Sequence, residues 1–153
     1  MPMVKSGNYF LSPAIFREEK VFPIASLRDL EGEAITAINS GMAVRTSLYG
    51  HYRYDERIFL DFVDHDFMRW CRSQGVQFCL MEGILIQQSF FGDSLPSARS
   101  RRIRARIYSK DYRVFYSKSG RGSLRISLEI LWYRLQIEYQ CLKNWIKRFK
   151  VGG

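Results

Sequence analysis

The segment at residues 54–69 reads YDERIFLDFVDHDFMR and carries five acids inside an otherwise apolar frame. Three of them, Asp61, Asp64 and Asp66, stand within six residues. Carboxylates this close raise one another's pKa and attract a cation, an arginine or a role in proton transfer. An acid cluster at the start of a helix is also favoured by the helix dipole, which is the simpler interpretation. The segment is therefore the first candidate for a chemical centre.

The same segment predicts a helix that begins at Asp61 or Val63 and ends near Gly75, because its apolar residues recur at helical spacing. Strand-like runs flank it at residues 34–38, 76–81 and 84–90. The short runs 9–11 and 21–24 are interrupted by prolines and are expected to be edge pieces of a sheet or loops. Strand, helix and strand in this order predict the α/β class.

Length and composition favour one globular domain, since 153 residues with 46% hydrophobic content can bury a sizeable core. The three cysteines, Cys71, Cys79 and Cys141, lie too far apart for a C-x-x-C motif. This spacing encodes neither a disulfide framework nor a zinc site, and it favours a reducing, cytoplasmic setting. No apolar run approaches the ~20 residues that span a bilayer.

Charge divides the chain at about residue 94. Residues 1–94 carry 9 Lys/Arg against 12 Asp/Glu, whereas residues 95–153 carry 15 against 3, a net charge of +12. We therefore expect an acidic α/β part at 1–94 and a basic helical extension at 95–153, whose charge suits an anionic partner.

The extension is expected to form two helices. Arginines recur through residues 99–106 in a helical stretch that continues to Tyr116, and a glycine-serine break follows at 119–123. The last helix is amphipathic and basic, with large apolar residues at steps of three, four or seven: Leu124, Leu128, Leu131, Leu135, Leu142, Trp145 and Phe149.

Three interpretations of this basic extension stay open. Its leucines pack the helix onto the domain and leave a solvated basic face, or the helix lies on an anionic membrane surface, and we weigh these two equally. A nucleic-acid module ranks lower. Its arginines could contact phosphates and Tyr108, Tyr112 and Tyr116 could stack on bases, but no nucleic-acid motif accompanies them.

Four local motifs follow one another in a specific order: INSGM at 38–42, YDE at 54–56, FLDFVDHDF at 59–67 and QQSFFG at 87–92. Together they resemble the C-terminal half of the inverting family 2 glycosyltransferases of the GT-A fold, in particular the rhamnosyltransferase-like enzymes of bacterial surface polysaccharide assembly. The ordered set is far more specific than any one motif.

The resemblance implies a role for each matching residue. Asp64 stands where the family has the general base that deprotonates the acceptor hydroxyl, and Asp61 and Asp66 would shape the same pocket. The turn at Asn39, Ser40 and Gly41 would hold the backbone near the donor sugar or the acceptor. Either Gln87 or Gln88 stands where many relatives have a histidine that contacts metal or diphosphate, and close relatives also use glutamine there.

The resemblance also implies partners. These are a nucleotide-sugar donor, a glycan or lipid-linked acceptor and, in the complete enzyme, Mg²⁺ or Mn²⁺ held partly by an Asp-x-Asp strand end. That strand belongs to the donor-binding half, to which nothing in this sequence corresponds. We therefore expect a second chain carrying the donor half or a homo-oligomer, an exposed apolar surface where that half packs, and a place at the cytoplasmic face of the membrane. A non-catalytic remnant or split subunit is the alternative.

Overall fold

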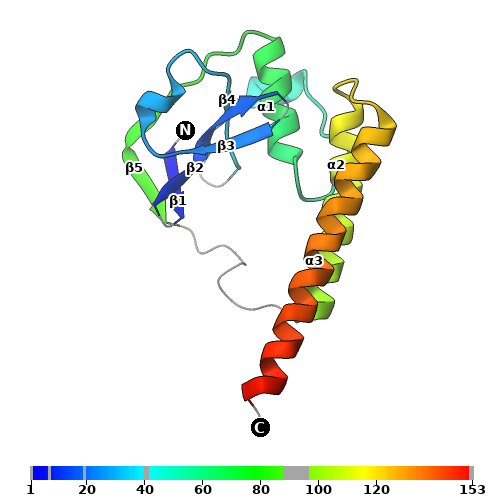
Figure 1. Ribbon diagram of the computed structural model, residues 1–153. Helices are drawn as coiled ribbons and strands as arrows, with labels where there is room; N and C mark the ends of the chain where they lie inside the picture. Colours follow the sequence, from blue (N-terminus) through cyan, green and yellow to red (C-terminus); the bar gives the residue numbers. More distant parts are fainter. Residues whose placement is uncertain (1, 7, 19, 40–41, 88–96, 152–153) are drawn as a thin grey trace. The chain divides into compact units, whose positions relative to one another are not determined.

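The computed structural model describes residues 2–6, 8–18, 20–39, 42–87 and 97–151 (Figure 1). The protein is a mixed α/β protein with one mixed sheet and three α-helices in these residues. It divides into two compact units, one formed by Met1–Glu56 and Phe62–Asp93, the other by Arg57–Asp61 and Ser94–Gly153. The division at 93/94 lies beside the charge boundary, but residues 57–61, inside the acidic segment, belong to the helical unit.

The first unit is built on a sheet with strand order β3-β2-β1-β5, to which β4 adds by pairing with β2. β1–β2, β2–β3 and β2–β4 are antiparallel, and β1–β5 is parallel. The strands are β1 at Pro2–Ser6, β2 at Tyr9–Arg17, β3 at Lys20–Ile24, β4 at Ile35–Thr36 and β5 at Met81–Gln87.

The expectation that the runs 9–11 and 21–24 are edge pieces or loops was wrong for 9–11, which lies in β2 with strands on both sides, whereas 21–24 lies in β3 at one end of the strand order. Pro13 lies inside β2 and has no N–H for a ladder hydrogen bond. The sheet accommodates it with irregular pairing, because the register with β3 shifts between Phe10 and Ile15. Proline within a sheet is found at such irregularities, and residues Ser12 to Ala14 are buried there.

The predicted central helix is present as α1 at Val63–Ser73, where Phe67, Met68 and Cys71 are each 1% exposed. They pack against two flanking stretches of the same unit, one of which holds Met42 and the other Phe78. The strand expected at 76–81 is not formed: residues 76–80 have no regular secondary structure, and β5 begins at Met81. Their apolar residues belong to the core without joining the sheet, so an apolar run alone did not distinguish the two.

The second unit consists of α2 at Ala98–Ser117 and α3 at Ser123–Val151, which pack along each other, together with residues 57–61 (Figure 1). Gly120, with φ of +76°, supplies the left-handed residue in the turn between the helices. The described part of the chain contains no helix that is both long enough and apolar enough to cross a membrane.

α3 faces α2 through residues other than the leucines. Ile126, Ile130 and Cys141 are buried, whereas Leu124, Leu128 and the other leucines of the helix are 54–73% exposed. Within the helical unit, these leucines are therefore not the residues that pack α3 against α2. The α2 interface lies on the opposite side of α3.

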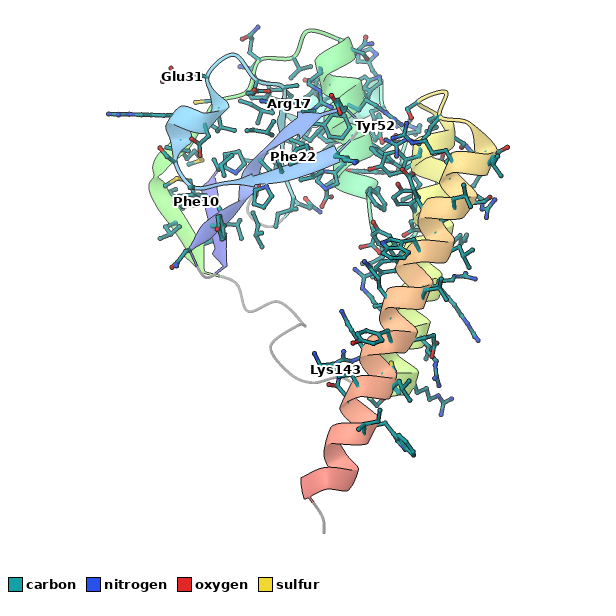
Figure 2. The ribbon with its side chains drawn as sticks, viewed as in Figure 1. Phe10, Arg17, Phe22, Glu31, Tyr52 and Lys143 are labelled. Atoms are coloured by element: carbon teal, nitrogen blue, oxygen red, sulfur yellow. The ribbon has the colours of Figure 1, made fainter. Side chains whose placement is uncertain are left out.

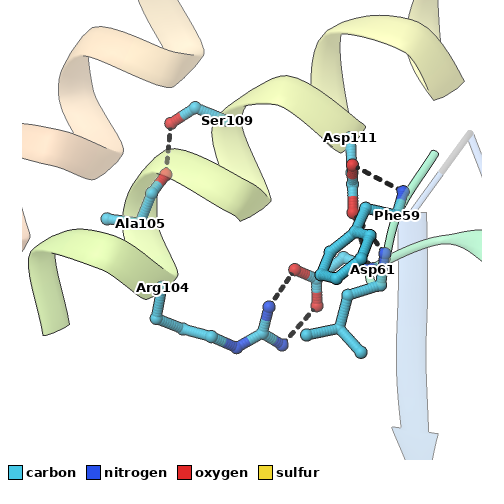
Figure 3. A network of polar contacts seen from close by, with 7 residues as sticks. Phe59, Asp61, Arg104, Ala105, Ser109 and Asp111 are labelled. Atoms are coloured by element: carbon cyan, nitrogen blue, oxygen red, sulfur yellow. Dashed lines mark hydrogen bonds and ion pairs between the residues drawn. The ribbon is translucent and has the colours of Figure 1, made fainter. Parts of the chain in front are cut away.

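A buried carboxylate fixes residues 57–61 to α2 (Figure 3). Asp111 is fully buried and accepts hydrogen bonds from the backbone N–H groups of Phe59, Leu60 and Asp61, at 2.9, 2.8 and 2.8 Å. The Asp61 side chain in turn forms a two-point ion pair with Arg104, about two turns before Asp111 on α2. Three N–H donors can compensate a buried carboxylate for the water that it loses.

Replacing Asp111 by Asn should lower the free energy of unfolding of the helical unit by about 3 kcal/mol. The amide keeps the shape, but it removes the charge and turns an NH₂ group toward donors that need an acceptor. Thermal denaturation would measure the loss, and amide exchange at Phe59 to Asp61 should accelerate.

Glu138→Gln is the matched control in the same unit. Its pair with Arg102 is about half exposed on both sides, so its loss should leave the melting temperature almost unchanged. Equal effects of the two substitutions would contradict the role assigned to Asp111.

Candidate functional site

The first turns of α1 and the stretch from Ile35 to Asn39 form the candidate site of the first unit. Three contacts fix this stretch along the helix. Arg72 donates to the Ile35 carbonyl at 2.5 Å, and the Thr36 hydroxyl shares a 2.8 Å hydrogen bond with Nδ1 of His65. The Asn39 N–H donates to Oδ2 of Asp64 at 2.8 Å. The polar side of α1 therefore sets the position of the segment that carries the Asn-Ser-Gly motif.

Asp64 lies in the first turn of α1, which has no side-chain N-cap. Its carboxylate is partly buried and accepts the Asn39 N–H. Burial raises the pKa of Asp64 above its ordinary value, and the Asn39 hydrogen bond opposes part of that rise. Among the contacts of the described residues, no lysine or arginine pairs with this carboxylate. A carboxylate with a raised pKa and no basic partner is suited to accept a proton.

Asp66 has a different environment, although it lies only two residues further along α1. It is 7% exposed, accepts a hydrogen bond from the Tyr52 hydroxyl at 3.2 Å and forms an ion pair with Arg69 at 2.5 Å. The Tyr52 ring packs against Phe67 with the ring centroids 5.0 Å apart. Asp66 is thus part of the aromatic core beside α1, where its carboxylate provides a hydrogen-bonding partner for the Tyr52 hydroxyl and for the Arg69 guanidinium.

Asp61 belongs to the helical unit, where Arg104 neutralises it. The three acids of the motif therefore have three different partners, and their described contacts do not join them in one pocket. Within the described residues, no group of three or more His, Cys, Asp or Glu is placed to hold a metal ion.

The remaining candidate residues are described only in part. The Met42 N–H donates to the Asn39 carbonyl at 3.1 Å, which closes the turn that the sequence predicted there. Ser40, Gly41 and Gln88 lie outside the described residues. Gln87 is the last residue of β5, and its side chain also lies outside the described part of the structure.

His65 is a member of this site that the sequence analysis did not select. Burial and the nearby Arg72 lower the pKa of its imidazole to about 4, so it is neutral at physiological pH. The sequence could have indicated that His65 faces the protein interior, because His65, Met68 and Arg72 follow one another at steps of three and four residues and so share one face of a helix. This face of α1 lies against the stretch at Ile35 to Asn39.

Comparison with known proteins adds no assignment: no protein-family model matches the chain, and neither the curated proteins nor the solved structures contain a significant match.

His65 should make stability depend on pH between about 4 and 6.5. In this window the unfolded chain binds a proton at His65 that the folded protein excludes. Its contribution is therefore complete above pH 6.5 and is lost as the pH falls to about 4, on the order of 3 kcal/mol in all.

Titration of the imidazole by NMR would give the pKa directly. Subtracting the pH profile of a His65→Gln variant from that of the wild type would isolate its contribution to stability. An imidazole that titrates near 6.5 would refute the buried, neutral state.

The two acids of α1 should respond differently to neutralisation. Asp66→Asn weakens the pairing of Arg69 and Tyr52 in a buried place, and should reduce the free energy of unfolding by about 2–3 kcal/mol. Asp64→Asn keeps an oxygen that can accept the Asn39 N–H and should reduce it by less than about 1 kcal/mol. Urea unfolding of both variants would compare them, and the reverse order would exchange the two roles.

Proposed function

We propose that the protein is the acceptor-side half of an inverting nucleotide-sugar glycosyltransferase, of the kind that builds bacterial surface polysaccharides. Asp64 is the general base. It takes the proton of the acceptor hydroxyl while that oxygen forms a bond to the anomeric carbon and the bond from this carbon to the diphosphate oxygen breaks. The nucleoside diphosphate leaves from the opposite face of the sugar.

The observation that carries the proposal is the state of Asp64 among the three acids. Arg104 pairs with Asp61 and Arg69 pairs with Asp66, whereas the Asp64 carboxylate has a backbone N–H as its partner. A general base needs a lone pair that is not committed to a cation and a pKa raised toward the working pH, and burial raises that of Asp64.

The Asn39–Asp64 hydrogen bond is the second support. It joins two motifs that lie 25 residues apart in the sequence and that the glycosyltransferase resemblance places in one pocket. A turn that is held against the base can position an acceptor hydroxyl next to it, which is the main requirement of such a transfer. Asp66, in contrast, is proposed as a positioning residue that acts through Arg69, whereas Asp61 pairs with Arg104 in the helical unit.

The donor side of the reaction would come from other residues. β5 stands at one end of the strand order, and Met81, Ile84 and Leu85 on it are 41–54% exposed. This apolar edge fits the surface on which a donor-binding half would pack. The described residues form no cluster suited to a divalent cation, so the Mg²⁺ or Mn²⁺ of such enzymes stays a prediction for the complete assembly.

Neutralising Asp64 should abolish transfer without unfolding the protein. The chain, alone and with candidate donor-half chains, would be incubated with UDP-, dTDP- and GDP-sugars, simple glycoside acceptors and Mn²⁺, and release of nucleoside diphosphate would be measured. Asp64→Asn should reduce the rate by about 10²–10⁴-fold, the usual contribution of a general base.

Glu31→Gln removes the same charge from an exposed position in the same unit and should leave the rate unchanged. Full activity of Asp64→Asn would remove Asp64 from the role. Release from no donor, together with no thermal stabilisation by any donor, would favour a non-catalytic remnant.

A further inference from the structure

α3 carries an apolar face that has no role in the packing of the helix against α2. Its members follow one another at steps of one, three or four residues, which places them on one side of the helix. We name this face the outer stripe; its members are 43–73% exposed and are Leu124, Leu128, Leu131, Trp132, Leu135, Tyr139, Leu142, Trp145 and Ile146.

The outer stripe lies opposite the face that contacts α2. Ile126 and Ile130 are buried in the helical unit, and the Tyr133 ring centroid lies 4.4 Å from that of Tyr108 on α2. Glu129 accepts a hydrogen bond from the Tyr112 hydroxyl at 2.7 Å, and Arg134 donates to the Ser109 hydroxyl at 3.1 Å. At about 100° per residue, these positions centre on the far side of the helix from the stripe. α3 is therefore apolar on two sides, and only one of them is covered within the helical unit.

Cations border the stripe. Helical geometry places Arg125 and Lys143 beside one edge and Arg134 beside the other. Arg125 also pairs with Glu129 at 3.3 Å, and Arg134 donates through Nε to the Ser109 hydroxyl, which leaves its other guanidinium N–H groups for a phosphate. The side chains of Arg125 and Lys143 are exposed, and Figure 2 shows Lys143 projecting from α3. From residue 121 to residue 150 the chain has 7 Lys/Arg and 2 Asp/Glu. An apolar face with aromatic residues and basic borders is the composition of helices that lie in a membrane interface.

A second copy of the chain fits the stripe less well. If two stripes packed face to face, the basic extensions of two copies would come together, and residues 95–153 of each copy carry a net charge of +12. The leucine spacing would also require an apolar residue at position 138 to continue a coiled-coil seam. That position holds Glu138, whose carboxylate pairs with Arg102 of α2 at 2.7 Å.

Nucleic acid fits less well too. The tyrosines of α2 are engaged in packing, since Tyr112 lies 4.2 Å from Tyr116 between ring centroids and Tyr108 contacts Tyr133. Tyr116 is only 4% exposed. These rings are not free to stack on bases, and a nucleic acid would not cover an apolar stripe.

We propose that the outer stripe of α3 binds the surface of an anionic lipid membrane, with its leucines and tryptophans inserted among the acyl chains and its basic borders at the lipid phosphates. The attachment is peripheral, and it rests on the helical unit alone, independently of the glycosyltransferase proposal.

The test is sedimentation of the full chain with lipid vesicles. Binding should be strong to phosphatidylcholine vesicles that contain about a third phosphatidylserine, weak to pure phosphatidylcholine, and reduced by high salt. The double substitution Leu131→Gln and Leu135→Gln should weaken binding about ten-fold or more, because it removes two inserted side chains. Emission of the tryptophans should shift to the blue on binding and be quenched by brominated lipids.

Ile103→Gln is the matched control, since this residue is also apolar and 48% exposed but lies on α2, outside the stripe. It should bind as the wild type does, and circular dichroism should show equal helicity for all variants. Failure of the wild type to sediment with anionic vesicles would overturn the proposal, as would wild-type binding by the leucine variant. A dimer in analytical ultracentrifugation that the leucine variant loses, without vesicle binding, would instead assign the stripe to a second copy.

Discussion

The carboxylate of Asp111 is the constraint on which the organisation of this chain depends. It is fully buried, and three consecutive N–H groups of residues 59–61 compensate its charge. A buried carboxylate without such donors would be strongly unfavourable, so the segment and α2 must form together. The segment lies in the middle of the acid-rich stretch, and its attachment to α2 assigns Asp61 to the helical unit while Asp64 and Asp66 begin α1 in the other.

A second set of polar contacts gives the candidate site its form. Arg72, His65 and Asp64 hold the stretch from Ile35 to Asn39 along α1 through backbone and hydroxyl groups. Such contacts fix position without neutralising the Asp64 carboxylate, whereas Asp61 and Asp66 are paired with arginines. Acids that look equivalent in sequence thus differ in chemistry, because the fold gives each carboxylate its own partner and its own degree of burial. The glycosyltransferase proposal rests on this difference and on the order of the motifs.

The helical unit shows the same division between structure and exposed surface. Burial of Ile126 and Ile130 against α2 stabilises the helix pair, and the tyrosines and Glu129 complete the interface. The larger apolar residues of α3 contribute little to this packing, since their side chains remain more than two-fifths exposed. A long helix can carry two apolar faces because its 3.6-residue period allows two independent stripes. One face packs against α2 within the helical unit, and the other is the face that we propose for membrane binding.

The sequence by itself determined the α/β fold class, the approximate extent of α1, α2 and α3, the turn that begins at Asn39 and the charge division near residue 94. These features depend on local periodicity, turn residues and composition, which are properties of neighbouring residues. Only the tertiary structure decided that β2 is central, that residues 76–80 form no strand and that the leucines of α3 face outward. It also decided that His65 is buried and neutral, and that each acid of the motif has its own partner. These outcomes depend on contacts between residues far apart in the chain, such as Asp111 with residues 59–61 and Asn39 with Asp64, whose energies no local pattern contains.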